Sequence, residues 1–220
     1  MIIARDIHKS FGALEVLKGI DLDIVPAKVT AIVGPSGAGK TTLLHILGTL
    51  SAPDRGGVVR YDGKDVTTLP DKELSRFRNA NIGFVFQNHL LLPEFSIQEN
   101  VALPAMIKGD SKNSAMEKAG RLLTELGLGD RLTHRPSELS GGECQRAAVA
   151  RALVNNPAVV LADEPSGSLD QVNRKALHRL FFDLRDKKGA TFVIVTHDTG
   201  LAADADIKIS MADGRIADIE

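Results

Sequence analysis

The chain has 220 residues, of which 43% are hydrophobic, so it can build one domain with a substantial core. Its 27 Lys and Arg residues are balanced by 28 Asp and Glu residues. Because no basic excess is available to neutralise a nucleic-acid backbone, we expect no nucleic-acid partner.

The first 24 residues contain two extended segments, 2–4 and 20–24, and the second alternates apolar and polar residues with period two. We expect two antiparallel strands with one face in water. Arg5 places a charge where a secretory signal would be apolar, so we expect no export signal.

Residues 29–47 predict a strand, a phosphate-binding loop and a helix. Val29–Val33 is a short apolar run, and Thr41–Leu47 has an apolar helical pattern. The intervening glycine loop and its first helical residues are the expected ATP-binding residues, namely Gly34, Pro35, Ser36, Gly37, Ala38, Gly39, Lys40, Thr41 and Thr42.

The glycine loop has a definite chemistry. Its glycines let successive backbone N–H groups point inward, and the following helix offers its positive end to phosphate. Lys40 is expected to reach the β- and γ-phosphates, and the Thr41 hydroxyl to ligate Mg²⁺. The alternative is a Gly-rich turn that happens to end in Lys-Thr; the flanking strand and helix favour the nucleotide site.

Further apolar runs at 82–86, 159–162 and 192–195 predict more buried strands. Strands that alternate with helices predict a mostly parallel sheet covered on both faces, which is an α/β fold. The C-terminal segment 207–219 predicts two short strands around the Asp213-Gly214 turn.

The pattern between residues 88 and 155 is helical, with candidate helices at 97–107, 114–126 and 142–154. We expect one domain over residues 1–220, with an inserted helical subdomain at about 88–155.

Asp163 and Glu164 follow the apolar run 159–162 and should emerge at the C-terminal edge of the sheet, where open α/β folds bind ligands. Asp163 is a candidate anchor for Mg²⁺, and Glu164 a candidate general base for the attacking water. The alternative is a polar strand end that enters a turn.

The signature segment, Leu139, Ser140, Gly141, Gly142 and Glu143, allows two interpretations. Ser140 and Glu143 form a capping-box pattern that starts a helix. Two glycines behind the serine also leave room for a phosphate at the helix N-terminus, at a cost to helix stability of roughly 1 kcal/mol each. Cys144 follows; its thiol is interpreted either as activated by the helix N-terminus or as an inert buried group.

The glycine loop, the signature segment and Asp163-Glu164, in this order, resemble the ATP-binding cassette (ABC) ATPases. The resemblance covers essentially the whole chain. It implies a RecA-like P-loop NTPase core with an antiparallel β subdomain and an inserted α-helical subdomain. It also implies that Phe11 stacks on adenine, that Gln87 contacts Mg²⁺ and the attacking water, that Asp170 lies in the D-loop (166–170) and that His197 contacts the γ-phosphate.

The same resemblance implies a mechanism. ATP with Mg²⁺ would bind the glycine loop of one protomer and the signature segment of another, so that two composite sites form in a head-to-tail homodimer. Hydrolysis would reopen the dimer and drive integral membrane permease subunits. No apolar run reaches the roughly 20 residues of a membrane span, so we expect no span in this chain. The resemblance implies a peripheral protein at the cytoplasmic face of the bacterial inner membrane.

Residues 86–101 and 134–142 are most similar to the ATPases that release lipoproteins from the bacterial inner membrane. Two related branches share most of these motifs: the macrolide or peptide exporters, and the cell-division ATPases that gate a signalling partner. DNA-repair or translation ABC proteins are disfavoured because the chain has one cassette and no long coiled-coil insertion. A P-loop kinase or GTPase is disfavoured by the signature segment and by the absence of an Asn-Lys-x-Asp motif.

Overall fold

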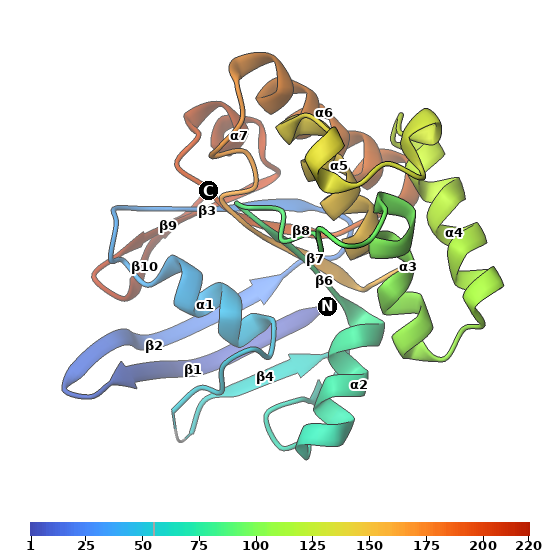
Figure 1. Cartoon of the computed structure of the whole chain (residues 1–220). Coiled ribbons are helices and arrows are strands. Elements are labelled where there is room, and N and C mark those ends of the chain that lie inside the picture. Colours follow the sequence, from blue (N-terminus) through green and yellow to red (C-terminus); the bar gives the residue numbers. More distant parts are fainter. Residues whose placement is uncertain (55) are drawn as a thin grey trace.

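The central sheet is built around β3, Val29–Val33, the apolar run that precedes the glycine loop. In the computed structural model, which describes residues 1–54 and 56–220, the spatial order of this sheet is β10-β9-β3-β8-β7-β6 (Figure 1). All neighbouring pairs from β9 to β6 are parallel, and only β10 is antiparallel. The other strands are β6 Ile82–Phe86, β7 Val159–Asp163, β8 Phe192–Val195, β9 Ile207–Ala212 and β10 Arg215–Ile219.

This arrangement confirms the predicted α/β class, the mostly parallel sheet and the C-terminal hairpin. Strands β7 and β8 are buried along almost their whole length, which explains their continuous apolar sequences. Because β3, β6, β7 and β8 are parallel, the segments that follow them leave the same edge of the sheet.

The second sheet is antiparallel and has the order β2-β1-β4-β5. Its strands are β1 Ile2–Phe11, β2 Leu14–Ile24, β4 Val58–Tyr61 and β5 Lys64–Asp65. Strands β1 and β2 are longer than the two predicted segments. The register shifts between Ala4 and Ile7, where Asp6 has a φ of 50°, so the apolar alternation on which the prediction relied is interrupted although the pairing continues.

The three predicted helices are present within a few residues of their expected bounds. Each begins at a serine N-cap, namely Ser96, Ser111 and Ser140. Helices α2, α6 and α7 are additional to the predicted elements. The helices are α1 Lys40–Leu47, α2 Asp71–Asn81, α3 Ile97–Lys108, α4 Lys112–Glu125, α5 Gly141–Leu153, α6 Gln171–Lys188 and α7 Thr199–Asp204, with 3₁₀ turns η1 Gly129–Arg131 and η2 Pro136–Glu138.

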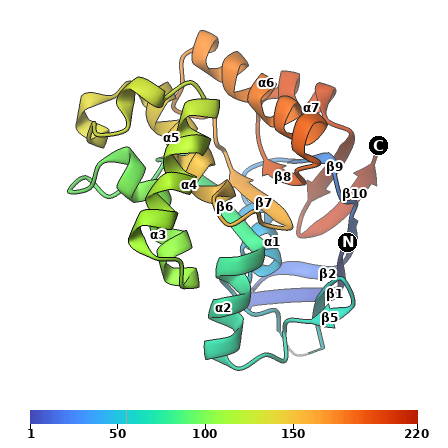
Figure 2. The same cartoon turned by 90° about the vertical axis from the view of Figure 1, so that its right-hand side faces the viewer.

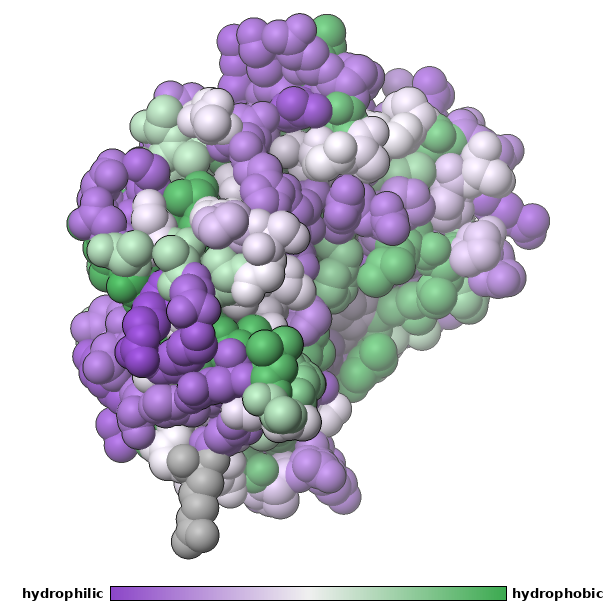
Figure 3. Space-filling model, turned by 90° about the vertical axis from the view of Figure 1, so that its left-hand side faces the viewer, coloured by the Kyte–Doolittle hydropathy of each residue, from purple (hydrophilic) through white to green (hydrophobic). Residues whose placement is uncertain are grey.

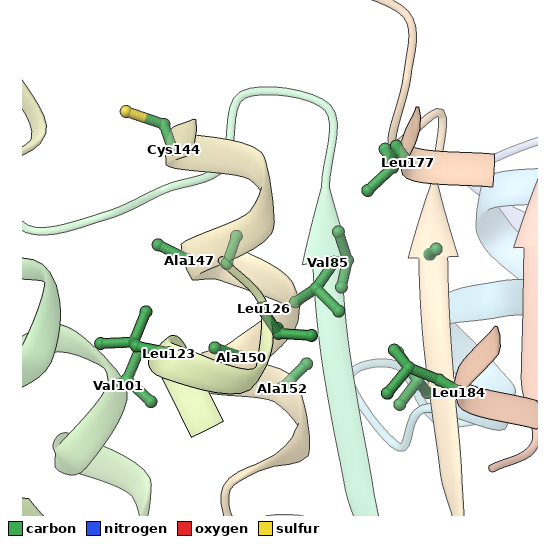
Figure 4. Close-up of a cluster of buried hydrophobic side chains, with 14 of the residues drawn as sticks. Val85, Val101, Leu123, Leu126, Cys144, Ala147, Ala150, Ala152, Leu177 and Leu184 are labelled. Carbon is green, nitrogen blue, oxygen red and sulfur yellow. The ribbon is translucent and has the colours of Figure 1, made fainter. Parts of the chain in front are cut away.

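Two hydrophobic clusters cover the two faces of the parallel sheet. One contains α1 and the inner face of the antiparallel sheet. The other joins α3, α4, α5 and α6 to the sheet, and part of it is shown in Figure 4. The predicted insertion therefore shares a core with the sheet; its separation as a subdomain at 88–155 stays a prediction.

Helix α5 packs unusually close to β6. Its buried face is formed mainly by alanines, and a Cβ at Gly83 of β6 would collide with the backbone of Ala152. Small residues on both elements permit this close packing. It fixes the position of α5, which begins with the signature segment, relative to β6. Figure 2 shows α5 on the same side of the sheet as α3 and α4.

Among the helices of the described ranges 1–54 and 56–220, none has both the length and the apolar character needed to cross a bilayer. The surface in Figure 3 is hydrophilic over most of its upper and left-hand parts, and hydrophobic residues gather along its right-hand side. Exposed apolar residues that gather in this way mark contact surfaces more often than scattered ones.

Phe181 of α6 is fully buried, and its ring centroid lies 5.0 Å from that of Phe192 in β8. We expect Phe181→Ala to lower the free energy of unfolding by about 3–5 kcal/mol, because the cavity would lie between helix and sheet. The partly exposed neighbour Phe182 is the control, and Phe182→Ala should cost about 1 kcal/mol or less. Urea unfolding measures both, and equal losses would contradict this assignment of the core.

Candidate functional site

A pocket at the C-terminal edge of the parallel sheet brings together most of the residues that the sequence predicts for nucleotide binding. The loops after β3, β7 and β8 form it together with the start of β2. Its lining residues are Leu14, Val16, Ser36, Gly37, Gly39, Lys40, Thr41, Thr42, Asp163, Glu164, Val195 and His197.

The glycine loop curls tightly before α1. Gly39 is the N-cap of the helix and has a φ of 93°, a left-handed conformation that favours glycine. At Gly34 a Cβ would collide with the backbone carbonyl of Met211 in β9. Gly34, Pro35 and Ala38 thus belong to the loop without lining the pocket, since Ala38 is buried in the core beneath it.

Lys40 is only 7% exposed, and its ammonium lies inside the curve of the loop. Nζ donates hydrogen bonds to the carbonyl oxygens of Gly34 (2.8 Å) and Pro35 (3.0 Å). The loop therefore concentrates one positive charge and the N-terminus of α1 at a single point, which is an arrangement for binding an anion.

Asp163 ends β7 and faces the start of α1. The Thr41 hydroxyl donates to Asp163 Oδ1 at 3.3 Å. A hydroxyl and a carboxylate at the edge of a phosphate loop are oxygen ligands of the kind that Mg²⁺ prefers.

Glu164 has a left-handed backbone with a φ of 46°, which costs of order 1–3 kcal/mol for a residue with a side chain. This conformation is held by the hydrogen bond from its N–H to the Val195 carbonyl of β8 (2.9 Å). The turn directs the carboxylate toward the pocket that Lys40 and His197 also line.

The Glu164 carboxylate is bound through one oxygen only. Oε2 accepts from the backbone N–H of His197 at 3.3 Å. Oε1 lies 3.2 Å from His197 Nε2 but is buried without a hydrogen-bond partner among residues 1–54 and 56–220. A buried carboxylate oxygen without a hydrogen-bond partner is costly in a packed protein, and this one faces the His197 ring.

The donor set fits Mg²⁺ only in combination with a phosphate. Within the described part of the chain no group of three or more His, Cys, Asp or Glu residues could hold a metal ion. Thr41 and Asp163 supply two oxygens. Mg²⁺ generally keeps waters and uses one or two protein carboxylates plus substrate phosphates, which this pair allows.

Gln87 and Phe11 do not line the pocket. Gln87 is exposed after β6, and its amide lies against Gly167, where a Cβ would be 2.9 Å from Nε2. Phe11 is 57% exposed at the end of β1, with Lys9 Nζ 5.6 Å from its ring centroid. Their predicted contacts with Mg²⁺ and with adenine stay predictions.

Leu14, Val16 and Val195 line the pocket without having been predicted. Leu14 pairs with Phe11 across the β1–β2 turn. Residues 14 and 16 are apolar and two positions apart, so they lie on the same face of a strand. This spacing, just after the aromatic Phe11, is the sequence signal that could have indicated them. Together they provide apolar surface beside the glycine loop.

The signature segment lies outside this pocket, since α5 and α1 are on different sides of the sheet (Figure 1). Ser140 caps α5 by accepting from Glu143 N at 3.3 Å, and Glu143 Oε2 accepts from Ser140 N (2.8 Å) and Oγ (2.7 Å). The predicted capping box is thus confirmed. Hydrogen bonds from the Ser140 side chain and backbone lower the pKa of Glu143, so the carboxylate stays ionised near neutral pH.

The two glycines of the signature segment have different surroundings. Gly141 is exposed, and the nearest atom to a Cβ there would be 3.7 Å away, on Leu169. Gly142 is buried, and a Cβ there would lie 2.6 Å from Asn173 Cγ. Both glycines were predicted to leave space for a phosphate. At Gly142 the close contact with Asn173 already explains why the residue is a glycine.

Cys144 is a buried core residue. Its Sγ donates to the Pro136 carbonyl at 3.4 Å, and burial together with the nearby Glu143 charge raises the pKa of the thiol. The alternative of a thiol activated by the helix N-terminus is therefore wrong, because desolvation opposes the thiolate at this position.

A sequence profile described as ABC transporter matches residues 17–167 of the chain. The lipoprotein-releasing system ATP-binding protein LolD of Bacteroides thetaiotaomicron is 62% identical over 98% of this chain and 99% of that protein. The protein of the same name from Porphyromonas gingivalis is 56% identical over 97% of each chain.

Solved structures of ATP-binding cassettes are similar to this chain along its whole length. A dimeric ATP-binding cassette in a post-hydrolysis state, bound to ADP and phosphate, superposes with a TM-score of 0.90 at 36% identity, over 100% of this chain and 98% of that one. Its fold is therefore the fold of this chain, as the sequence predicted.

The anion-binding role of Lys40 can be tested directly. We expect Lys40→Ala to weaken nucleotide binding by about 10- to 100-fold, because charge-assisted hydrogen bonds to phosphate would be lost. Titration with a fluorescent nucleotide measures the effect, and Lys118→Ala, which removes a surface lysine paired with Asp110, is the control. Equal affinity in the two variants would exclude Lys40 from the binding site.

Proposed function

This chain belongs to the ABC transporter family, and from that premise we propose that it hydrolyses ATP to drive a separate membrane permease. The observation that carries the proposal is the single pocket in which Lys40, Thr41, Asp163, Glu164 and His197 meet. A phosphate loop, a metal-anchoring carboxylate and a second carboxylate beside a histidine are the parts that ATP hydrolysis requires.

The residues that line the pocket have different roles in the proposed hydrolysis. Lys40 and the loop N–H groups hold the β- and γ-phosphates, while Thr41 and Asp163 hold Mg²⁺ with its waters. Mg²⁺, when bound, would neutralise charge that develops on the phosphates. Glu164 orients the attacking water and takes its proton, and His197, whose Nε2 lies 3.2 Å from Glu164 Oε1, contacts the γ-phosphate.

The active form is a homodimer with two composite sites. Support comes from the positions of the two halves of the site within one chain: the glycine loop and the signature segment share no pocket, and α1 and α5 belong to different core clusters. A partner protomer would bring Ser140 and Gly142 to the nucleotide. Asp170 lies at the start of α6 near this surface, and its carboxylate is held by Asn173.

The cargo that we infer is lipoprotein, at the cytoplasmic face of the bacterial inner membrane. The support is the identity of 55–62% with proteins named as lipoprotein-releasing ATP-binding subunits, along nearly the whole chain. The macrolide or peptide exporters and the cell-division ATPases are less favoured, because these relatives do not carry such names.

The permease is proposed to dock in a groove between α2, β6 and α3. Its lining includes Phe86, Leu90 and Ile107, and Ile107 is 74% exposed. Arg151 of α5 donates to the carbonyls of His89 (2.7 Å) and Leu90 (2.6 Å), two residues with left-handed backbones. The groove thus borders the segment that starts with Gln87, which connects the docking surface to the catalytic edge.

Glu164→Gln should retain ATP binding and lose hydrolysis by about 10²- to 10⁴-fold, because the water loses its base. In Mg-ATP the variant should be trapped as a dimer, which size-exclusion chromatography detects; Lys40→Ala is the monomeric control. A monomeric Glu164→Gln protein with full activity would show that another group serves as the base.

Ser140→Arg should abolish hydrolysis and leave ATP binding to the monomer intact, because its steric block acts only in a partner's site. Loss of the helix cap would itself cost about 1 kcal/mol of stability. Ser111→Arg, at the serine N-cap of α4, controls for that loss. If Ser140→Arg weakens nucleotide binding by the isolated monomer, the site is not shared between protomers.

Ile107→Asp should reduce recovery of the co-purifying membrane protein from detergent-solubilised membranes by about tenfold or more, because a charge would enter the apolar groove. ATP hydrolysis by the isolated chain should stay within about twofold of wild type, since Ile107 lies outside the pocket. Ile219→Asp, at an exposed position of β10, is the control. Unchanged recovery would place the permease elsewhere.

A further inference from the structure

The first turn of α6 contacts three loops that belong to different parts of the proposed mechanism. Asp170 is the N-cap of this helix. Asn173 engages both of its carboxylate oxygens, with its N–H donating to Oδ1 (2.9 Å) and its Nδ2 donating to Oδ2 (2.6 Å). The end of the D-loop is therefore fixed to the helix by two hydrogen bonds to one charged group.

Asn173 also touches the signature segment. Its side chain lies so close to Gly142 that a Cβ at position 142 would be 2.6 Å from Cγ. Helices α5 and α6 lie over the same face of the sheet and share one core, so this contact cannot open without disturbing that core (Figure 1). Asn173 thereby sets the separation between the D-loop and the signature segment.

Arg174 extends the connection to the loop that carries His197. Its guanidinium donates to the Leu169 carbonyl of the D-loop through one terminal nitrogen (3.2 Å), and the other lies 3.6 Å from Asp198 Oδ2. Asp198 follows His197 and caps α7 by accepting from Leu201 N at 2.9 Å. Arg174 thus bridges the D-loop and the residue next to the switch histidine.

The guanidinium is held by its two ends alone. Arg174 Nε is buried without a hydrogen-bond partner in the described part of the chain. An unused buried donor costs free energy, so the bridging geometry is kept at the expense of local stability.

We propose that Asn173 and Arg174 are positioning residues that lock the signature segment, the D-loop and the His197 loop of one protomer into a single unit. The inference rests on the proposed function, because the first two segments face the partner's nucleotide and His197 faces the protomer's own.

The contact with Gly142 is tested by a rescue. Gly142→Ala should lower the ATPase rate by about tenfold or more, through collision with Asn173. Asn173→Ala alone should lower it by about threefold, and the double variant should recover to that level. Gly141→Ala makes the same chemical change without the collision, so Asn173→Ala should not restore any activity that it loses.

If the double variant is no faster than Gly142→Ala, Gly142 is needed for another reason and the inference is overturned. Thermal unfolding of every variant identifies proteins that fail to fold. Should Gly142→Ala not fold, Asn173→Gln replaces it, because the longer amide presses on Gly142 from the other side. That variant should lose about tenfold in kcat with unchanged monomer nucleotide affinity, and full activity would overturn the inference.

The contact with Asp198 is tested by Arg174→Gln, which should lower kcat by about tenfold while the Kd of the monomer for ATP is unchanged. Arg174→Lys should restore part of kcat, since an ammonium can still reach Asp198 or the Leu169 carbonyl. Arg179→Gln, an exposed change on the same helix, is the control. Unchanged kcat, or a parallel loss of nucleotide affinity, contradicts the positioning role.

The ATPase activity of the wild-type chain distinguishes a failure of this inference from a failure of the proposed function. If the wild-type chain hydrolyses ATP and these variants behave otherwise, only the inference is wrong. If the wild-type chain does not hydrolyse ATP, the proposed function itself is overturned.

Discussion

The parallel pairing of β3 with β8, of β8 with β7 and of β7 with β6 is the constraint on which the rest of the structure depends. It brings the segments that follow these strands to one edge, although they are up to about 160 residues apart in the chain. Buried apolar side chains on both faces hold the register, so the positions of Lys40, Asp163 and His197 follow from packing far beneath them. The pocket is therefore a product of the core.

Two local features convert this edge into a catalytic arrangement. The left-handed backbone of Glu164 turns the carboxylate into the pocket, and the hydrogen bond to Val195 balances the strain. The second feature is the buried Oε1, which is left without a partner in the described chain while Oε2 is fixed by the backbone of His197. In the proposed mechanism this carboxylate, oriented by the backbone of His197, serves as the base for one water molecule.

Much of this could be predicted from the sequence. Continuous apolar runs predicted the bounds of β3, β6 and β8 to the residue, and helical patterns separated by Gly and Pro predicted the starts of α3, α4 and α5 within two residues. Helix α2 turns only Leu74 and Phe77 toward the core, both partly buried, so its apolar stripe is too short to indicate a helix. The full length of β1 and β2 was hidden by the irregularity at Asp6, which breaks the alternation without ending the ladder.

The sequence by itself determined the chemical inventory of this protein: a phosphate loop, two carboxylates after an apolar strand, and a capped glycine-rich helix start. These are local patterns, in which neighbouring residues and their spacing already define the geometry. Only the tertiary structure decided which of them meet. It brought Leu14 and Val16 into the pocket, left Gln87 and the signature segment outside it, and set Asn173 against Gly142. The physical reason is that such contacts depend on how helices pack over the sheet, and the spacing of residues along the chain does not encode that packing.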